Sequence, residues 1–142
     1  MTDASQKVAA LQTALAAEHA ASYGYGIIGA HLNGAALKVA SADWVLHERA
    51  RDALAKLITA LGATPAPAAP AYQLPVAVTS AADAAKLAAD LELQVVTAYV
   101  NLVAVADPGL RQLAATSMQN ASVRAARWGG RSRAFPGLAL EG

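Results

Sequence analysis

Two glutamates occupy positions that a helical core normally gives to apolar side chains. Glu18 falls in a series with the three- and four-residue steps of a buried helix face: Val8, Leu11, Leu15, Glu18, Ser22 and Tyr25. Glu92 widens a second apolar face in the same way, next to Leu87, Leu91 and Val95. A buried carboxylate left unpaired costs several kcal/mol or takes up a proton. The two glutamates are therefore candidates for ion pairing or for metal binding.

Further polar residues interrupt two other apolar faces. One face has His47 and Arg51 in its middle, with Glu48 next to them: Trp44, His47, Arg51, Leu54, Ile58 and Leu61. The last periodic stretch carries Arg124. Histidine and glutamate bind metals, whereas arginine only donates hydrogen bonds, so the mixture leaves ion pairing and metal binding both open.

The elements that position these residues are four predicted helices. Asn33-Gly34, Gly62, Asp107-Pro108-Gly109 and Gly129-Gly130 supply the turn and stop signals. Residues 62–79 contain four prolines and predict an extended connector that is long enough to run the length of a helix. The predicted helices cover about 4–32, 38–61, 80–106 and 110–128.

Two helical hairpins joined by a long Pro/Ala-rich crossover predict an all-α protein, a ferritin-like four-helix bundle. We assign residues 1–128 to the bundle and 129–142 to an irregular C-terminal tail. Antiparallel helices bring residues equidistant from a turn side by side. Counting from the turns places one polar layer at mid-height: Glu18, His47, Glu48, Arg51, Glu92 and Arg124.

Five segments carry a family resemblance: EHAASYGYGIIGAHL, HERARDAL, GATPAPAAPAYQLP, LE and VRAARW. They resemble an uncharacterised family of ferritin-like domains from high-GC, actinobacterial genomes. The order of polar residues is also similar to that of the ferritin-like superfamily of di-iron carboxylate bundles. The resemblance covers nearly the whole chain and implies a fold rather than an assigned activity.

The superfamily site takes one Glu from each of two helices and a Glu-x-x-His pair from each of the other two. The resemblance matches Glu18 and Glu92 to the single glutamates and Glu48 to the first member of a pair. Arg51 stands at the histidine position, and the last helix offers neither Glu nor His in its nearest frame, residues 119–122. The implied di-iron site is therefore degenerate.

Because a guanidinium cannot coordinate a cation but can bridge carboxylates, we expect Arg51 to replace the metal's charge. The predicted result is a self-neutralised network without a metal cofactor, in a binding or scaffolding module that has no catalytic residues. One alternative is an iron or other single-metal site in a ferritin-like oxidase or iron-handling protein, with the ligands Glu18, His47, Glu48 and Glu92. Another is a small-ligand pocket in the bundle core. Tyr25 and Tyr99 are interpreted as packing residues with one hydrogen bond.

The charge distribution offers one more function. Residues 1–110 hold six Lys/Arg against nine Asp/Glu, whereas residues 111–142 hold five arginines against one glutamate. The C-terminal arginines, interleaved with Trp128 and Phe135, are a weak signal for nucleic-acid binding: Arg124, Arg127, Arg131 and Arg133. A formal net charge of +1 does not favour that function.

Composition excludes some classes and favours others. The absence of cysteine excludes disulfide frameworks and thiolate metal sites. We expect no membrane span, because the charge-free helical stretches are either too short or carry glycine, asparagine and histidine. The N-terminal segment carries Asp3 and Lys7 where a secretory signal needs an apolar run, so we expect a cytoplasmic protein. Apolar residues on all sides of the alanine-rich helices favour a homodimer.

Overall fold

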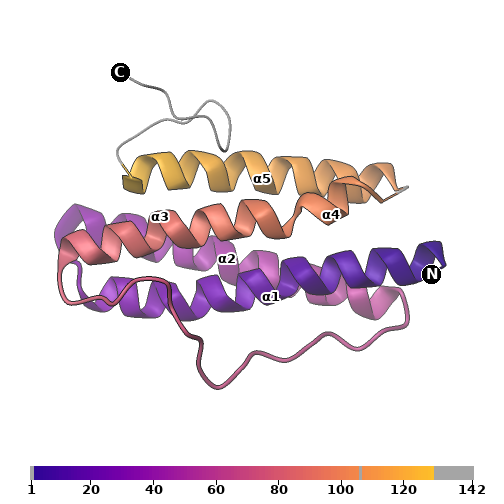
Figure 1. Cartoon of the computed structure of the whole chain (residues 1–142), viewed down its shortest axis with the longest axis horizontal. Coiled ribbons are helices and arrows are strands. Elements are labelled where there is room, and N and C mark those ends of the chain that lie inside the picture. Colours follow the sequence, from indigo (N-terminus) through magenta and orange to yellow (C-terminus); the bar gives the residue numbers. More distant parts are fainter. Residues whose placement is uncertain (1, 106, 130–142) are drawn as a thin grey trace.

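The computed structural model describes residues 2–105 and 107–129, and these form an all-helical bundle (Figure 1). The predicted all-α, ferritin-like architecture of two hairpins and a long crossover is confirmed. No helix in these two ranges is long and apolar enough to cross a membrane. The helices are α1 (Asp3–Ala30), α2 (Gly34–Ala60), α3 (Ala81–Ala98), α4 (Val100–Val103) and α5 (Pro108–Gly129).

The first hairpin turns more tightly than its sequence predicts. Gly34, which we interpreted as part of a helix stop, begins α2 directly instead of leaving a gap up to residue 38. Its φ of 56° is in the left-handed region, which glycine adopts without strain. The amide of Leu37 then donates to the carbonyl of Asn33 at 3.2 Å, closing the first turn of α2.

The third predicted helix is interrupted where the sequence indicates continuity. It ends at Ala98, and α4 follows after Tyr99. At this point the amide of Leu102 donates to the carbonyl of Tyr99 at 3.1 Å, which is the tighter spacing of a 3₁₀ turn. The chain thereby changes direction while Leu102 stays fully buried.

The crossover runs along α1 from one end of the bundle to the other (Figure 1). Gln12 fixes it twice, donating to the carbonyl of Thr64 at 2.8 Å and accepting from the amide of Ala66 at 2.9 Å. Ser80 then caps α3 by accepting from the amide of Asp83. The crossover is therefore fixed against α1, and it returns the chain to the end of the bundle where α3 begins.

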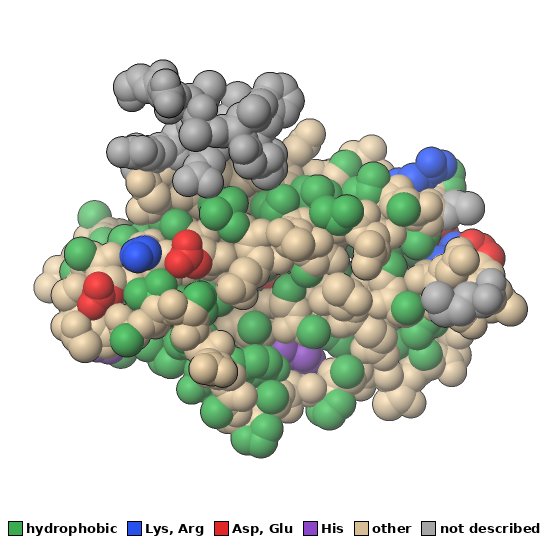
Figure 2. All heavy atoms as spheres, in the orientation of Figure 1, with side chains coloured by type: hydrophobic (Ala, Val, Ile, Leu, Met, Phe, Trp, Pro, Cys, Tyr) green, Lys and Arg blue, Asp and Glu red, His purple; other side chains and the backbone are tan. Residues whose placement is uncertain are grey.

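Three of the four sides of the bundle are closely packed. Helix α1 packs against α2 and α3, and α3 packs against α5. Within the described residues, α2 and α5 do not pack directly against each other, so long side chains bridge the gap between them. Figure 2 shows hydrophobic side chains distributed along one face of the molecule, with charged ones near its two ends.

The core consists of two apolar clusters. One is centred on Leu11, Leu15 and Leu102, and the other on Ile28 and Leu87. Between the two clusters lie the buried charged side chains, which come from three different helices.

Candidate functional site

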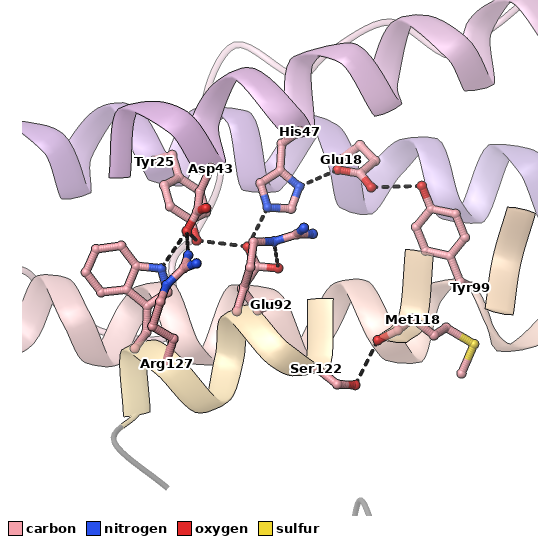
Figure 3. A network of polar contacts seen from close by, with 11 residues as sticks. Glu18, Tyr25, Asp43, His47, Glu92, Tyr99, Met118, Ser122 and Arg127 are labelled. Carbon is pink, nitrogen blue, oxygen red and sulfur yellow. Dashed lines mark hydrogen bonds and ion pairs between the residues drawn. The ribbon is translucent and has the colours of Figure 1, made fainter. Parts of the chain in front are cut away.

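His47 on α2 connects two glutamates of other helices in the middle of the bundle (Figure 3). Its Nδ1 lies 2.6 Å from Oε2 of Glu18 on α1, and its Nε2 lies 2.5 Å from Oε1 of Glu92 on α3. The three residues are at most 2% exposed. The histidine therefore joins three helices through two charge-assisted hydrogen bonds inside the core.

Two tyrosines complete the hydrogen bonding of the glutamates in a reciprocal way. Tyr25 lies seven residues after Glu18 but donates to Glu92 at 2.8 Å. Tyr99 lies seven residues after Glu92 but donates to Glu18 at 2.8 Å. Helix α1 thus supplies one carboxylate and one phenol, and so does α3 together with Tyr99 at its C-terminal end. Each phenol donates to the carboxylate of the other segment.

Helix α5 supplies two arginines to the same region. The Nε of Arg124 donates to both carboxylate oxygens of Glu92 at 3.0 Å. One turn further on, Arg127 pairs with the buried Asp43 of α2, and the indole of Trp128 donates to the same oxygen at 2.9 Å. Asp43 is therefore the anchor that connects α2 with α5.

Charge balances within this ion cluster, which we define as Glu18, Asp43, His47, Glu92, Arg124 and Arg127. Burial acts to lower the pKa of His47, but the hydrogen bonds that it donates to Glu18 and Glu92, together with their charges, raise it to about 9. Burial acts to raise the pKa of Glu92, but His47 and Arg124 hold it below its usual range. At neutral pH three cations therefore face three carboxylates.

The tyrosines remain protonated donors in this environment. Burial, followed by the charge of Glu92, raises the pKa of Tyr25 well above its ordinary value. Burial and the charge of Glu18 do the same to the pKa of Tyr99. Both phenols therefore keep their protons at neutral pH and donate to the carboxylates of Glu92 and Glu18.

The sequence and the fold are similar to those of known proteins. The chain matches the family described as Domain of unknown function (DUF4439) over residues 10–140. The chain belongs to the DUF4439 family. It is 38% identical to a conserved hypothetical protein from Mycobacterium tuberculosis, with a TM-score of 0.85, covering 89% of this chain and 96% of that one.

A second solved structure is similar to this DUF4439 chain in fold alone. It is described as a ferritin-like, diiron-carboxylate protein from Bacillus anthracis, at 16% identity and a TM-score of 0.73, covering 92% of this chain and 97% of that one. No curated protein matches the chain. The chain is therefore a DUF4439 member with a ferritin-like fold.

Four of the six residues that the sequence places in one layer do lie together: Glu18, His47, Glu92 and Arg124. Arg51 does not, and its expected role as the bridge between glutamates is wrong. Its side chain is 30% exposed, with Nε donating to Asp52 at 3.0 Å and Nη2 lying 3.8 Å from Oε2 of Glu48. Glu48 is also outside the cluster, because its side chain is 40% exposed. The long Arg51 side chain keeps its charge in water, and His47 takes the bridging position.

Sequence reasoning missed Asp43 and the structural role of Arg127. Asp43 lies four residues before His47, so helical spacing places it on the same face. Arg127 follows Arg124 by three residues for the same reason, but we interpreted it as part of a basic tail. In the structure, Arg124, Arg127 and Trp128 are engaged inside their own chain, whereas Arg131, Arg133 and Phe135 lie outside the described residues.

The residues present do not fit a di-iron centre of the ferritin-like kind. Such a centre takes Glu-x-x-His from two helices, but α5 contributes only the guanidinium and indole groups of Arg124, Arg127 and Trp128, which cannot coordinate a metal. On α2, Glu48 faces away from the cluster and His47 is hydrogen bonded through both ring nitrogens. Within the described residues no three His, Cys, Asp or Glu side chains form a group suited to a metal ion.

Proposed function

We propose that this protein is a metal-free ferritin-like module whose buried carboxylates are held by protein cations, and that it acts by binding or scaffolding. The proposal depends above all on the two arginines of α5. Arg124 and Arg127 are three residues apart, the spacing of a Glu-x-x-His pair, and they contact Glu92 and Asp43. Helix α5 thus carries two cationic side chains where a di-iron protein of this fold has metal ligands.

Protonated His47 supports the same conclusion. A histidine that binds a metal must be neutral and must offer a free lone pair. Here both nitrogens face carboxylates at 2.5 and 2.6 Å, and the pKa of the ring is raised to about 9. The arrangement therefore favours an imidazolium that bridges Glu18 and Glu92, and such a bridge has a structural rather than a catalytic role.

Elemental analysis tests the proposal. The full chain, purified from cells grown with added iron, is expected to contain far less than one iron or manganese per chain. A double variant, Arg124→Glu with Arg127→His, puts the missing ligand pair on α5 and serves as the comparison, because it is expected to retain more metal than the parent. Stoichiometric metal in the unmodified protein, lost on Glu18→Ala, would overturn the proposal.

A further inference from the structure

A pocket of about 250 Å³ lies outside the ion cluster, between α1, α2 and the crossover. Its residues come from all three segments: His19, Ser22 and Tyr23 from α1; Trp44, Glu48 and Arg51 from α2; Ala68, Ala69 and Tyr72 from the crossover. Its volume is just below the roughly 300–1,000 Å³ of pockets for drug-sized ligands, so the pocket suits a small ligand.

Aromatic rings form much of this pocket. The ring centroids of Tyr23 and Tyr72 are 5.5 Å apart and the rings are tilted by 53°, so they form a corner rather than a stack. The hydroxyl of Tyr72 accepts from the amide of Ala69 at 2.8 Å, which holds the ring in place. Trp44 lines the same pocket and is 40% exposed, so its indole is accessible to a ligand. Aromatic faces attract cations, above all desolvated ammonium groups.

The lining carries one carboxylate, Glu48, and one guanidinium, Arg51. The Nε of Arg51 is hydrogen bonded at 3.0 Å to Asp52, which lies outside the lining. Glu48 has only a long contact with Arg51, 3.8 Å. Because Asp52 holds Arg51 at closer range, Glu48 retains capacity to pair with a cationic ligand.

Two polar groups add hydrogen-bonding capacity. The Oγ of Ser22 is buried and has no hydrogen-bond partner within the described residues. His19 donates from Nε2 to the carbonyl of Ala66 at 3.0 Å, which leaves Nδ1 as its second hydrogen-bonding atom. A ligand with a hydroxyl near its positive charge would satisfy Ser22.

We propose that this pocket binds a small alkylated ammonium ion, with Tyr23, Trp44 and Tyr72 against the alkyl groups and Glu48 opposite the charge. The inference deepens the proposed function, since it names a ligand class for the binding module, but it uses no residue of the ion cluster. A second hollow of about 270 Å³ between α1 and α4 lacks this chemistry, because neither a charged nor an aromatic side chain lines it.

The test uses choline as the probe and the full chain as the protein. Titration at constant ionic strength, followed by isothermal calorimetry in the parent and in every variant, is expected to show saturable binding. The neutral isostere 3,3-dimethyl-1-butanol has the same shape without the charge and is expected to bind roughly 2- to 30-fold more weakly, the range that cation–π energies correspond to. Equal binding of the two probes, or no binding of choline, would overturn the proposal.

Matched variants locate the site. Glu48→Gln and Trp44→Leu are each expected to weaken choline binding several-fold, whereas Asp3→Asn, which removes the same charge at the start of α1 and outside the pocket, leaves it unchanged. Preferential binding of the anion 3,3-dimethylbutyrate, lost on Arg51→Met, would overturn the cation assignment. Co-sedimentation with phosphatidylcholine vesicles would contradict a free ligand and indicate a lipid headgroup. None of these outcomes changes the expected metal content. The ammonium-binding proposal can therefore fail while the metal-free proposal stands, and the reverse also holds.

Discussion

Arg124 lies against Glu92 with its Nε 3.0 Å from each carboxylate oxygen, and this contact brings α5 to the buried centre of the bundle. Glu92 is fully buried, whereas the side chain of Arg124 is 13% exposed. The carboxylate therefore depends on partners that its own helix does not supply. The ion cluster is thus shared among α1, α2, α3 and α5.

Removing the charge of Arg124 is expected to destabilise the fold strongly. Arg124→Met removes one of the two cations that contact Glu92. Removing one partner of a buried ion pair costs roughly 3–5 kcal/mol of folding free energy. Urea denaturation at pH 7 measures the change in the free energy of unfolding. Adding Glu92→Gln to Arg124→Met is expected to recover part of the loss, and a double variant that is worse than the sum would contradict the pairing.

Arg51→Met is the matched control. Because Arg51 is 30% exposed and pairs only with solvated carboxylates, its loss is expected to change stability by less than about 1 kcal/mol. A loss of stability as large as that of Arg124→Met would contradict the exposed position of Arg51 and support the bridging role that the sequence alone predicted for it.

Stability is expected to be greatest between about pH 4.5 and 6.5. The pKa of His47 is raised from 6.5 to about 9, so its contribution is fully present below pH 6.5 and is lost as the pH rises through 9, a change of about 3 kcal/mol. The pKa of Glu92 is lowered from 4.5, so its contribution is present above pH 4.5 and is lost as the pH falls through its folded value.

Melting temperatures from pH 4 to pH 10 check this profile. His19→Gln is the control, since His19 contacts only the crossover and its loss is expected to leave the alkaline decline unchanged. A flat profile between pH 6.5 and 9 would show that His47 does not carry a proton in the folded state.

Asp43→Asn is expected to loosen the end of α5. Asp43 accepts from Arg127 and Trp128 and bridges the gap between α2 and α5, so the neutral amide retains shape but loses the charge that holds the guanidinium. Hydrogen exchange of the last turn of α5 is expected to accelerate, while exchange in α1 changes little. Asp52→Asn is the control, because that carboxylate contacts only Arg51, and equal acceleration in both variants would contradict the bridge.

Two glycines of α1 test how closely the helices approach. A Cβ on Gly24 would lie 2.3 Å from Cδ1 of the buried Leu91, whereas a Cβ on Gly26 would meet nothing within 4 Å. Both alanine variants gain helix propensity, so the difference between them isolates overpacking, roughly 1–3 kcal/mol. Thermal denaturation is expected to rank Gly26→Ala as the more stable variant, and the reverse order would contradict the α1 and α3 packing.

Much of the fold could be predicted from the sequence because its signals are local. Apolar steps of three and four residues define helices, and four prolines in residues 62–79 exclude a helix between the hairpins. The break at Tyr99 carries no such signal, because a single tightened turn depends on how α4 packs against α5.

The ion cluster was less predictable because its partners are far apart in sequence. Counting from the turns brings Glu92 and Arg124 to one level, but His47 and Arg51 are one turn apart on α2 and helical spacing cannot rank them. Side-chain length decides between them, since arginine can reach solvent from the edge of the core and the shorter histidine cannot. Asp43 and its partner Arg127 are 84 residues apart in the sequence, so no local sequence pattern predicts their contact.

The protonation state of His47 tests the central claim most directly. Nitrogen-15 NMR of the imidazole at pH 7 is expected to show protons on both Nδ1 and Nε2, a titration near pH 9, and no change when one equivalent of ferrous iron is added without oxygen. His19 and His31, which are not in the ion cluster, provide references in the same spectrum. A neutral His47 ring at pH 7, or its selective loss of signal with iron, would contradict a cluster held by protein cations.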